Sequence, residues 1–238
     1  MHTDLNFFTN EPGQTLLDRF KATLKDTQYF DVLVGYFRAS GFYQLSEVID
    51  PIDKVRILVG LGIDEDAYNT ISQYRDQATF DFESHQTAKK EFQKNLVSEI
   101  ENSKESDQLL ETGLRNFIRF LREACADPDN DKKQYGNGKK LEIKAYPSKN
   151  IHAKVYISRY KNNISHIQYG SVITGSSNFS VSGLVSNREF NVHLKDRRDV
   201  EYALDQFEKL WKDSIDISAE FVDSVQNKTW LNDTIQPY

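Results

Sequence analysis

Two residues suited to phosphate chemistry occur together in the segment "IHAKVYISRY", residues 151–160. Its apolar character predicts a β-strand, in which successive side chains point to opposite faces of the sheet. His152 and Lys154 would then share one face, and Ala153, Val155 and Ile157 the other. A protonatable imidazole beside a fixed ammonium group suits a phosphate better than an apolar core.

More polar residues end the next strand-like segment and begin the one after it. The run "SVITGSSNFS" supplies small residues that allow close backbone approach, with hydroxyl and amide groups that can bond phosphate oxygens. The run "SNREFNV" adds a carboxylate, which can fix the tautomer of a histidine and favour its charged form. We therefore expect a site with catalytic His152, Lys154, Asn178 and Glu189, and with phosphate-binding Gly175, Ser176 and Ser177.

The order of these residues resembles the phospholipase D superfamily. The resemblance rests on His-x-Lys at 152 and 154, Gly-Ser-x-Asn at 175, 176 and 178, and Asn-x-Glu at 187 and 189. The family motif often places an aspartate, generally regarded as structural, five residues after the lysine, where this chain has Arg159. The resemblance implies an α/β fold: an αβα sandwich of phospholipase D type with a mixed sheet.

The resemblance also implies a two-step displacement at a phosphodiester that uses no metal and no other cofactor. One histidine attacks phosphorus and forms a phosphohistidine, and a second motif's histidine protonates the leaving oxygen. Paired lysines stabilise the charge that builds up on the phosphate. Two His-x-Lys motifs are therefore required.

A second His-x-Lys pair, His193 and Lys195, does not supply the missing motif. It is followed by Asp199 and a helical pattern instead of Gly-Ser-x-Asn, so we interpret it as a pair at a strand end. His2, His85 and His166 have no partner pattern and receive no role. Single-motif members of the family complete the site by homodimerising, and we expect the same here.

The elements that must position these residues follow from hydrophobic spacing. Residues 29–37, 40–50 and 54–62 read as strand, helix and strand, a βαβ unit with parallel pairing. We expect four more strands, over 141–147, 151–160, 166–176 and 188–195, with a turn in "KNNISH". The expected helices are 13–27, an insertion at about 64–125, and 199–213. Residues 127–140 read as a flexible connection.

Composition narrows the class of protein. The 238 residues carry a net charge of -6, which argues against indiscriminate binding to nucleic acid. A basic run from Lys132 to Lys161 contains one acid, and we assign Lys139, Lys140 and Lys149 to a nucleic-acid approach. The single cysteine, Cys125, excludes disulfides within the chain, and we expect neither a secretory leader nor a membrane-spanning segment.

These features favour the endonuclease branch and a cytoplasmic protein without membrane contact. The segments "NFFTN", "DVLVGYFRASGF", "VRILVGLGID" and "WLNDTIQPY" resemble the N-terminal domain joined to Swi/Snf-type helicases in bacterial restriction or phage-defence proteins. We expect one phospholipase D-like domain over 1–238, with its motif-bearing half at 141–213, cut from a longer helicase-containing protein. DNA, a second copy and the fused helicase are its expected partners. The alternative is a catalytically silent nucleic-acid-binding or dimerisation module.

Overall fold

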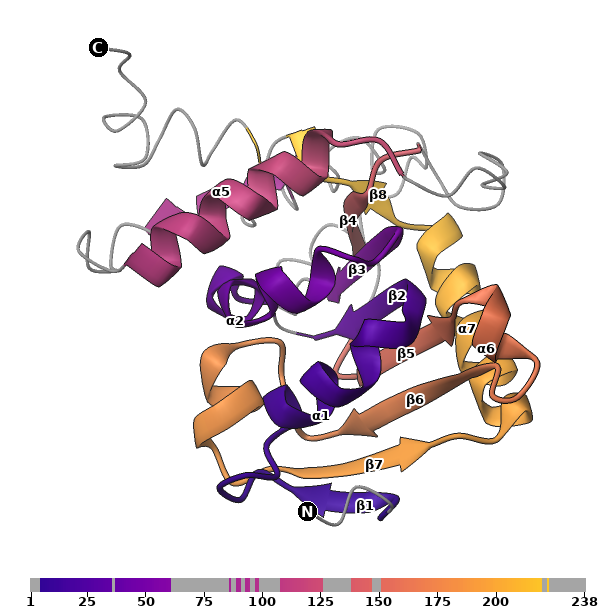
Figure 1. Ribbon diagram of the computed structural model, residues 1–238. Coiled ribbons are helices and arrows are strands. Elements are labelled where there is room, and N and C mark those ends of the chain that lie inside the picture. Colours follow the sequence, from indigo (N-terminus) through magenta and orange to yellow (C-terminus); the bar gives the residue numbers. More distant parts are fainter. Residues whose placement is uncertain are drawn as a thin grey trace, which may run out of the picture.

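A mixed sheet forms the centre of the molecule (Figure 1). The computed structural model describes residues 5–35, 37–60, 108–125, 138–146, 151–219 and 222, with helical residues 86, 89, 90, 93, 94, 97 and 98. In this part of the chain the strand order is β1-β7-β6-β5-β2-β3-β4-β8. The strands are β1 (Phe7–Thr9), β2 (Thr27–Val34), β3 (Lys54–Gly60), β4 (Leu141–Tyr146), β5 (Lys154–Tyr160), β6 (Gly170–Gly175), β7 (Phe190–Leu194) and β8 (Ile215–Asp216).

The pairing divides the sheet into a parallel centre and antiparallel flanks. β2, β3 and β4 are parallel neighbours, which confirms the predicted βαβ unit. β5 runs antiparallel to β2, and β6, β7 and β1 continue the antiparallel alternation outward. The start of β5 therefore lies at the same edge of the sheet as the ends of β2 and β3.

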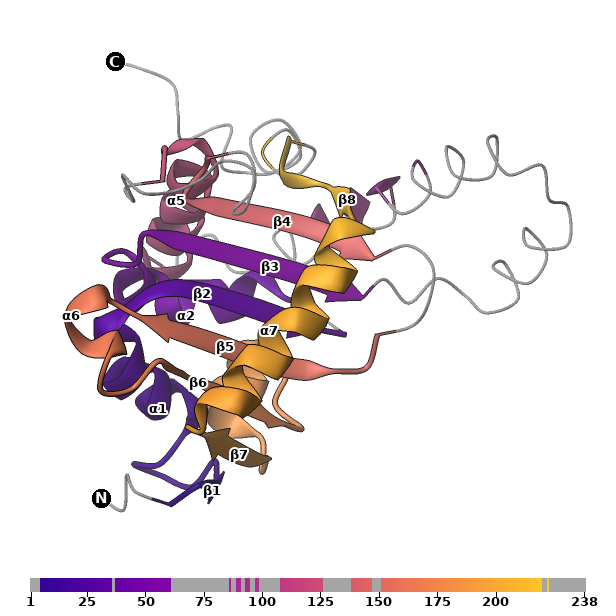
Figure 2. The same ribbon diagram turned by 90° about the vertical axis from the view of Figure 1, so that its right-hand side faces the viewer.

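Helices cover both faces of the sheet (Figure 2). One face carries α1 (Leu16–Thr23), α2 (Ala39–Ile49) and α5 (Gln108–Arg122), and α7 (Arg197–Lys212) crosses the other. α1 begins at a capping box, in which Thr15 and Asp18 satisfy each other's free backbone N–H groups. The predicted α/β class, a mixed sheet between helices, is confirmed. None of the described helices is long and apolar enough to cross a membrane.

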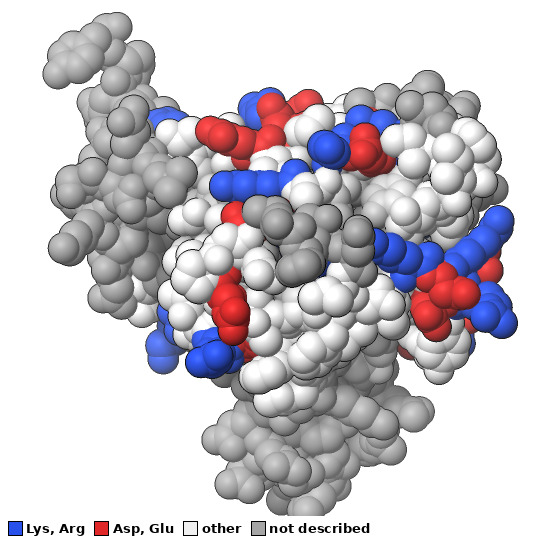
Figure 3. All heavy atoms as spheres, turned by 60° about the horizontal axis from the view of Figure 1, so that its bottom comes forward, with Lys and Arg blue, Asp and Glu red and all other residues white. Residues whose placement is uncertain are grey.

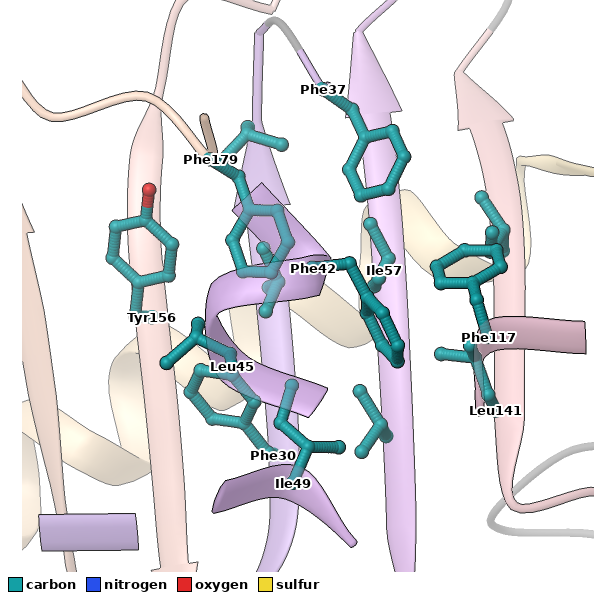
Figure 4. Packing of buried hydrophobic residues seen from close by; sticks show 14 of the residues in the cluster. Phe30, Phe37, Phe42, Leu45, Ile49, Ile57, Phe117, Leu141, Tyr156 and Phe179 are labelled. Atoms are coloured by element: carbon teal, nitrogen blue, oxygen red, sulfur yellow. The ribbon is translucent and has the colours of Figure 1, made fainter. Parts of the chain in front are cut away.

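The larger core lies under α1, α2 and α5 (Figure 4). Phe42 of α2 packs edge-on against Phe117 of α5, with ring centroids 4.3 Å apart. α5 lies within the predicted helical insertion at about 64–125, which we expected to be exposed or to bind a partner, and its apolar stripe is buried against α2. The rest of that predicted insertion is described at only a few helical residues between 86 and 98.

The face under α7 buries charged residues as well as apolar ones. Arg56 is completely buried, and its guanidinium bonds Asp31 at 2.6 Å and Glu208 at 2.7 Å. Arg159, the residue that departs from the family motif, bonds the other oxygen of Asp31 at 3.1 Å. Burial alone would raise the pKa of Asp31, but the two guanidinium groups outweigh it and hold the pKa below its usual value. Arg159 therefore helps to hold β5 against β2.

Several elements differ from prediction. The short edge strands β1 and β8 were not predicted, because two or three residues carry too little periodicity to be recognised. The segment "KNNISH" contains one helical turn, α6 (Asn162–Ser165). β6 and β7 are shorter than predicted, and a π-helical turn (Ser182–Ser186) connects the residues after β6 to β7.

Candidate active site

The candidate site lies at the edge of the sheet where β2 and β3 end and β5 begins. Gly35 and Gly60, the residues at these two exits, let the backbone of residues 151 and 152 pass close by. A Cβ atom on Gly35 would lie 2.2 Å from the Ile151 carbonyl oxygen, and one on Gly60 would lie 2.7 Å from the same atom. Both strands therefore need glycine at their exits.

His152 and Lys154 lie at this edge of the sheet, at the start of β5. β5 begins at Lys154, so His152 lies in the extended segment just before the strand. The His152 side chain is exposed, and the Lys154 ammonium donates to the His152 carbonyl oxygen at 2.9 Å. Ala153, Val155 and Ile157 pack toward α7, as the strand alternation predicted. An accessible imidazole beside a cation is thus presented from a fixed strand.

The Gly-Ser-Ser-Asn segment follows β6, the neighbour of β5. A Cβ atom on Gly175 would lie 2.2 Å from the Phe190 carbonyl oxygen, so the absence of a side chain permits this close strand contact. Ser176 is exposed, and its hydroxyl accepts from the Phe190 N–H at 3.0 Å. Asn178 is half-buried, and its Oδ1 atom is buried without a hydrogen-bond partner in the structure. The Asn178 amide nitrogen, and not this buried oxygen, is the group that can donate to a phosphate oxygen.

Glu189 belongs to the same group of residues, but its partners differ from the predicted one. Its carboxylate accepts from the Ser176 hydroxyl, and from the Asn187 amide at 3.2 Å. In the described part of the chain it makes no hydrogen bond to His152. Glu189 therefore fixes Ser176 and Asn187 within one copy, and the expectation that it orients a histidine is not met there.

Two of the predicted binding residues are wrongly assigned. Ser177 is completely buried, and its hydroxyl accepts from the Asn191 amide at 2.9 Å, so it faces the interior and not a phosphate. Lys140 is also buried; its ammonium donates to the Asp50 carbonyl oxygen and lies 4.7 Å from the centre of the Phe120 ring. Its charge is used within the fold.

Lys139 is exposed, but it lies far from His152. It precedes β4, whose parallel register with β3 places residue 141 beside Val55 and residue 146 beside Gly60. At roughly 3.3 Å per residue, the length of β4 puts the two ends of the strand on the order of 20 Å apart. Lys139 therefore sits at the opposite edge of the sheet from the site, and its role in DNA binding stays a prediction. Lys149 lies outside the described residues.

The surface carries both signs of charge around the antiparallel end of the sheet. On the face drawn in Figure 3, lysine and arginine side chains alternate with acidic ones instead of forming a continuous basic stripe. Arg188, next to Glu189, is itself paired with Glu11 at 3.3 Å. This pattern agrees with the acidic net charge and not with a broad cationic surface.

The second His-x-Lys pair is built differently from the first. His193 lies on β7 with 1% of its surface exposed, and neither ring nitrogen has a hydrogen-bond partner among the residues that the structure describes. Burial, together with the charges of Lys195 and Arg19, lowers the pKa of His193 to about 4. This neutral, enclosed imidazole cannot reach a substrate, which supports its exclusion as a second motif.

Residues 121–211 match the family model described as "Cardiolipin synthase, PLD-like domain". This range contains every motif residue, so the resemblance to the phospholipase D superfamily is supported for the motif-bearing part. No curated protein matches the chain in sequence.

Three solved structures resemble this fold at low identity. Nuc from Salmonella typhimurium, a phospholipase D family member, is 13% identical, with a TM-score of 0.44 over 88% of this chain and 95% of that one. NucT from Helicobacter pylori is 14% identical, with a TM-score of 0.43 over 88% and 96%. Phosphatidylserine synthase from Haemophilus influenzae is 10% identical, with a TM-score of 0.46 over 89% and 39%.

Proposed function

We propose that this chain is a metal-independent phosphodiesterase, an endonuclease domain that cleaves DNA through a phosphohistidine at a homodimer interface. The observation that carries the proposal is the exposed His152 beside Lys154, at the sheet edge that also holds Ser176 and Asn178. These residues bring a nucleophile, a cation and neutral hydrogen-bonding groups to one edge of the sheet. That combination suits an anionic phosphodiester.

The chemistry assigns a step to each group. A ring nitrogen of His152 attacks phosphorus, a P–N bond forms, and the P–O bond to the leaving group breaks. A second imidazole gives its proton to the leaving oxygen, and then takes a proton from the water that hydrolyses the phosphohistidine. Lys154 stabilises the charge on the phosphate oxygens. Ser176 and Asn178 orient the phosphate, and Glu189 holds Ser176 in place.

No second imidazole lies near His152 in the part of the chain that the structure describes, so the proposal takes it from another copy of the chain. Among the described residues, His193 is buried, and His166 follows α6 at the far end of β5 from His152. A twofold axis that brings two copies of His152 together would supply nucleophile and acid from identical residues. Light scattering should then give the mass of a dimer, and a strict monomer under assay conditions would contradict this part of the proposal.

DNA as the substrate and a fused Swi/Snf-type helicase rest on the sequence resemblance. The acidic net charge and the distance of Lys139 from the site suggest weak DNA binding by this domain alone. A helicase motor in the same protein would hold the substrate and present it to the site. The catalytically silent nucleic-acid-binding or dimerisation module is the second candidate, favoured by the partners of Glu189, which among the described residues are Ser176 and Asn187 and not His152.

Incubation with single- and double-stranded DNA in excess chelator separates the two candidates. We expect cleavage that persists in chelator, disappears in His152→Ala and is unchanged in His166→Ala, a matched substitution of another exposed histidine. Binding without cleavage in all three proteins would favour the silent module. Cleavage that depends on added divalent metal would contradict the proposed chemistry.

Mixing subunits tests the shared site directly. If each site needs both copies of His152, random reassociation of equal amounts of wild-type and His152→Ala chains leaves about a quarter of the dimers active. Activity per wild-type subunit should then fall by about half. Unchanged activity per wild-type subunit would mean that one copy of the chain contains a complete site.

A further inference from the structure

Ser177 lies between Ser176 and Asn178 but points away from the site. Its carbonyl oxygen accepts from the Tyr156 hydroxyl at 2.7 Å, and its side-chain oxygen accepts from the Asn191 amide at 2.9 Å. Tyr156 comes from β5 and Asn191 from β7, the two strands that flank β6. The middle of the loop is therefore held from both sides.

Tyr156 is a rigid donor for this bond. Its ring is buried, and the ring centroid lies 5.1 Å from that of Phe20 and 6.3 Å from that of Phe179. Figure 4 shows Tyr156 beside Phe179. Burial, with a further contribution from the charge of Glu189, raises the pKa of Tyr156, so the hydroxyl keeps its proton and donates. The fixed ring leaves the hydroxyl little freedom to follow a displaced loop.

Tyr156 also lies on the strand that presents the catalytic pair. It follows Lys154 by two residues on β5 and shares its face of the sheet, whereas Ser176 and Asn178 follow β6. The bond from Tyr156 to Ser177 therefore joins the strand carrying the cation to the loop that orients the phosphate. Thr174, at the end of β6, also donates to the Lys154 carbonyl oxygen at 2.9 Å, but that bond holds the strand, whereas the Tyr156 bond holds the loop itself.

We infer that Tyr156 is a positioning residue, whose hydroxyl sets the placement of the Ser176–Asn178 loop relative to His152 and Lys154. The inference rests on the proposed phosphodiesterase function, and it gives Ser177 a role as the point at which the loop is held. Ser177 thus serves the site through its carbonyl and not through contact with phosphate. Misplacement of a phosphate-orienting group by a fraction of an ångström lowers the rate more than it weakens binding, because attack requires alignment.

Two tyrosines of the same strand provide a matched test. Tyr156→Phe removes the hydroxyl that bonds the loop, and Tyr160→Phe removes a hydroxyl that bonds Ser171 at 3.1 Å near the other end of β5. On bis(4-nitrophenyl) phosphate we expect Tyr156→Phe to lower kcat by roughly 10- to 100-fold, with KM changed less than about twofold. Tyr160→Phe should retain wild-type kcat and KM.

Hydrogen–deuterium exchange gives a readout that needs no activity. The peptide covering residues 175–180 should exchange faster in Tyr156→Phe than in the wild type, and at the wild-type rate in Tyr160→Phe. Equal kcat and equal loop exchange in the two variants would overturn the inference, as would a kcat loss in Tyr156→Phe without faster loop exchange. A wild-type chain without phosphodiesterase activity would contradict the proposed function, and faster exchange confined to Tyr156→Phe would then still support the positioning of the loop.

Discussion

Two His-x-Lys pairs with identical spacing have opposite surroundings in this molecule. His152 is exposed beside Lys154, where the backbone crosses two glycine exits. His193 is buried on β7, and burial, Lys195 and Arg19 lower its pKa to about 4. Residue types and spacing therefore identify candidates for catalysis, and exposure of the side chain to solvent decides between them.

The largest expected difference between the pairs is in catalysis. His152→Ala removes the nucleophile and should lower kcat on bis(4-nitrophenyl) phosphate by about 10³-fold or more, close to 4 kcal/mol. His193→Leu should leave kcat within about threefold of wild type, because the buried ring does not touch the site. Steady-state kinetics on both variants checks this. A comparable loss of kcat in His193→Leu, in a variant that remains folded by circular dichroism, would contradict the assignment of catalysis to His152 and not to His193.

Substitution of the two lysines should show the same contrast in catalysis, with a smaller loss than substitution of the histidines. Lys154→Ala removes a cation next to the phosphate and should lower kcat/KM by about 10²-fold, near 2.7 kcal/mol. Lys195→Ala removes an exposed charge outside the site and should change kcat/KM by less than about twofold. If both substitutions had equal effects, general electrostatic attraction to the substrate would explain them better than a local contact.

The smallest expected effect is a pH dependence of the free energy of unfolding, caused by His193 of the second His-x-Lys pair. Because the pKa of His193 is lowered to about 4 in the fold, the unfolded chain binds more protons than the native chain between about pH 4 and 6.5. The free energy of unfolding should therefore decrease as the pH falls, with His193 contributing about 2 kcal/mol between pH 7 and pH 5. Urea denaturation at the two pH values measures the loss.

His193→Leu should reduce this pH dependence, while His166→Leu, which replaces an exposed histidine, should retain the wild-type dependence. An unchanged pH dependence in His193→Leu would mean that the pKa of His193 is the same in the folded and the unfolded chain. Burial would then not lower the pKa of His193.

Much of the site was predictable, because strand alternation and motif order are local properties. The two-residue repeat of a β-strand correctly predicted that Ala153, Val155 and Ile157 face α7, on the side of the sheet away from His152 and Lys154. Hydrophobic spacing also identified the βαβ unit and the strands that carry the motif. It did not reveal β1, which is three residues long, or the helical turn α6.

The errors concern residues whose surroundings come from distant parts of the chain. Ser177 was assigned to phosphate, but Tyr156 and Asn191 hold it from the neighbouring strands. Lys140 was assigned to DNA, but Asp50 and Phe120 enclose its ammonium group. Neither environment can be read from the residues next to it in the sequence.

The sequence by itself determined the chemical groups, their order and the faces of the strands on which they occur, because backbone geometry repeats every two residues. The tertiary structure decided which imidazole is accessible, because the fold buries His193 near Arg19 of α1 and leaves His152 exposed before β5. It also decided that two glycines leave room for the backbone that carries His152. Burial and close approach depend on packing between segments far apart in the chain, and spacing within one segment does not encode them.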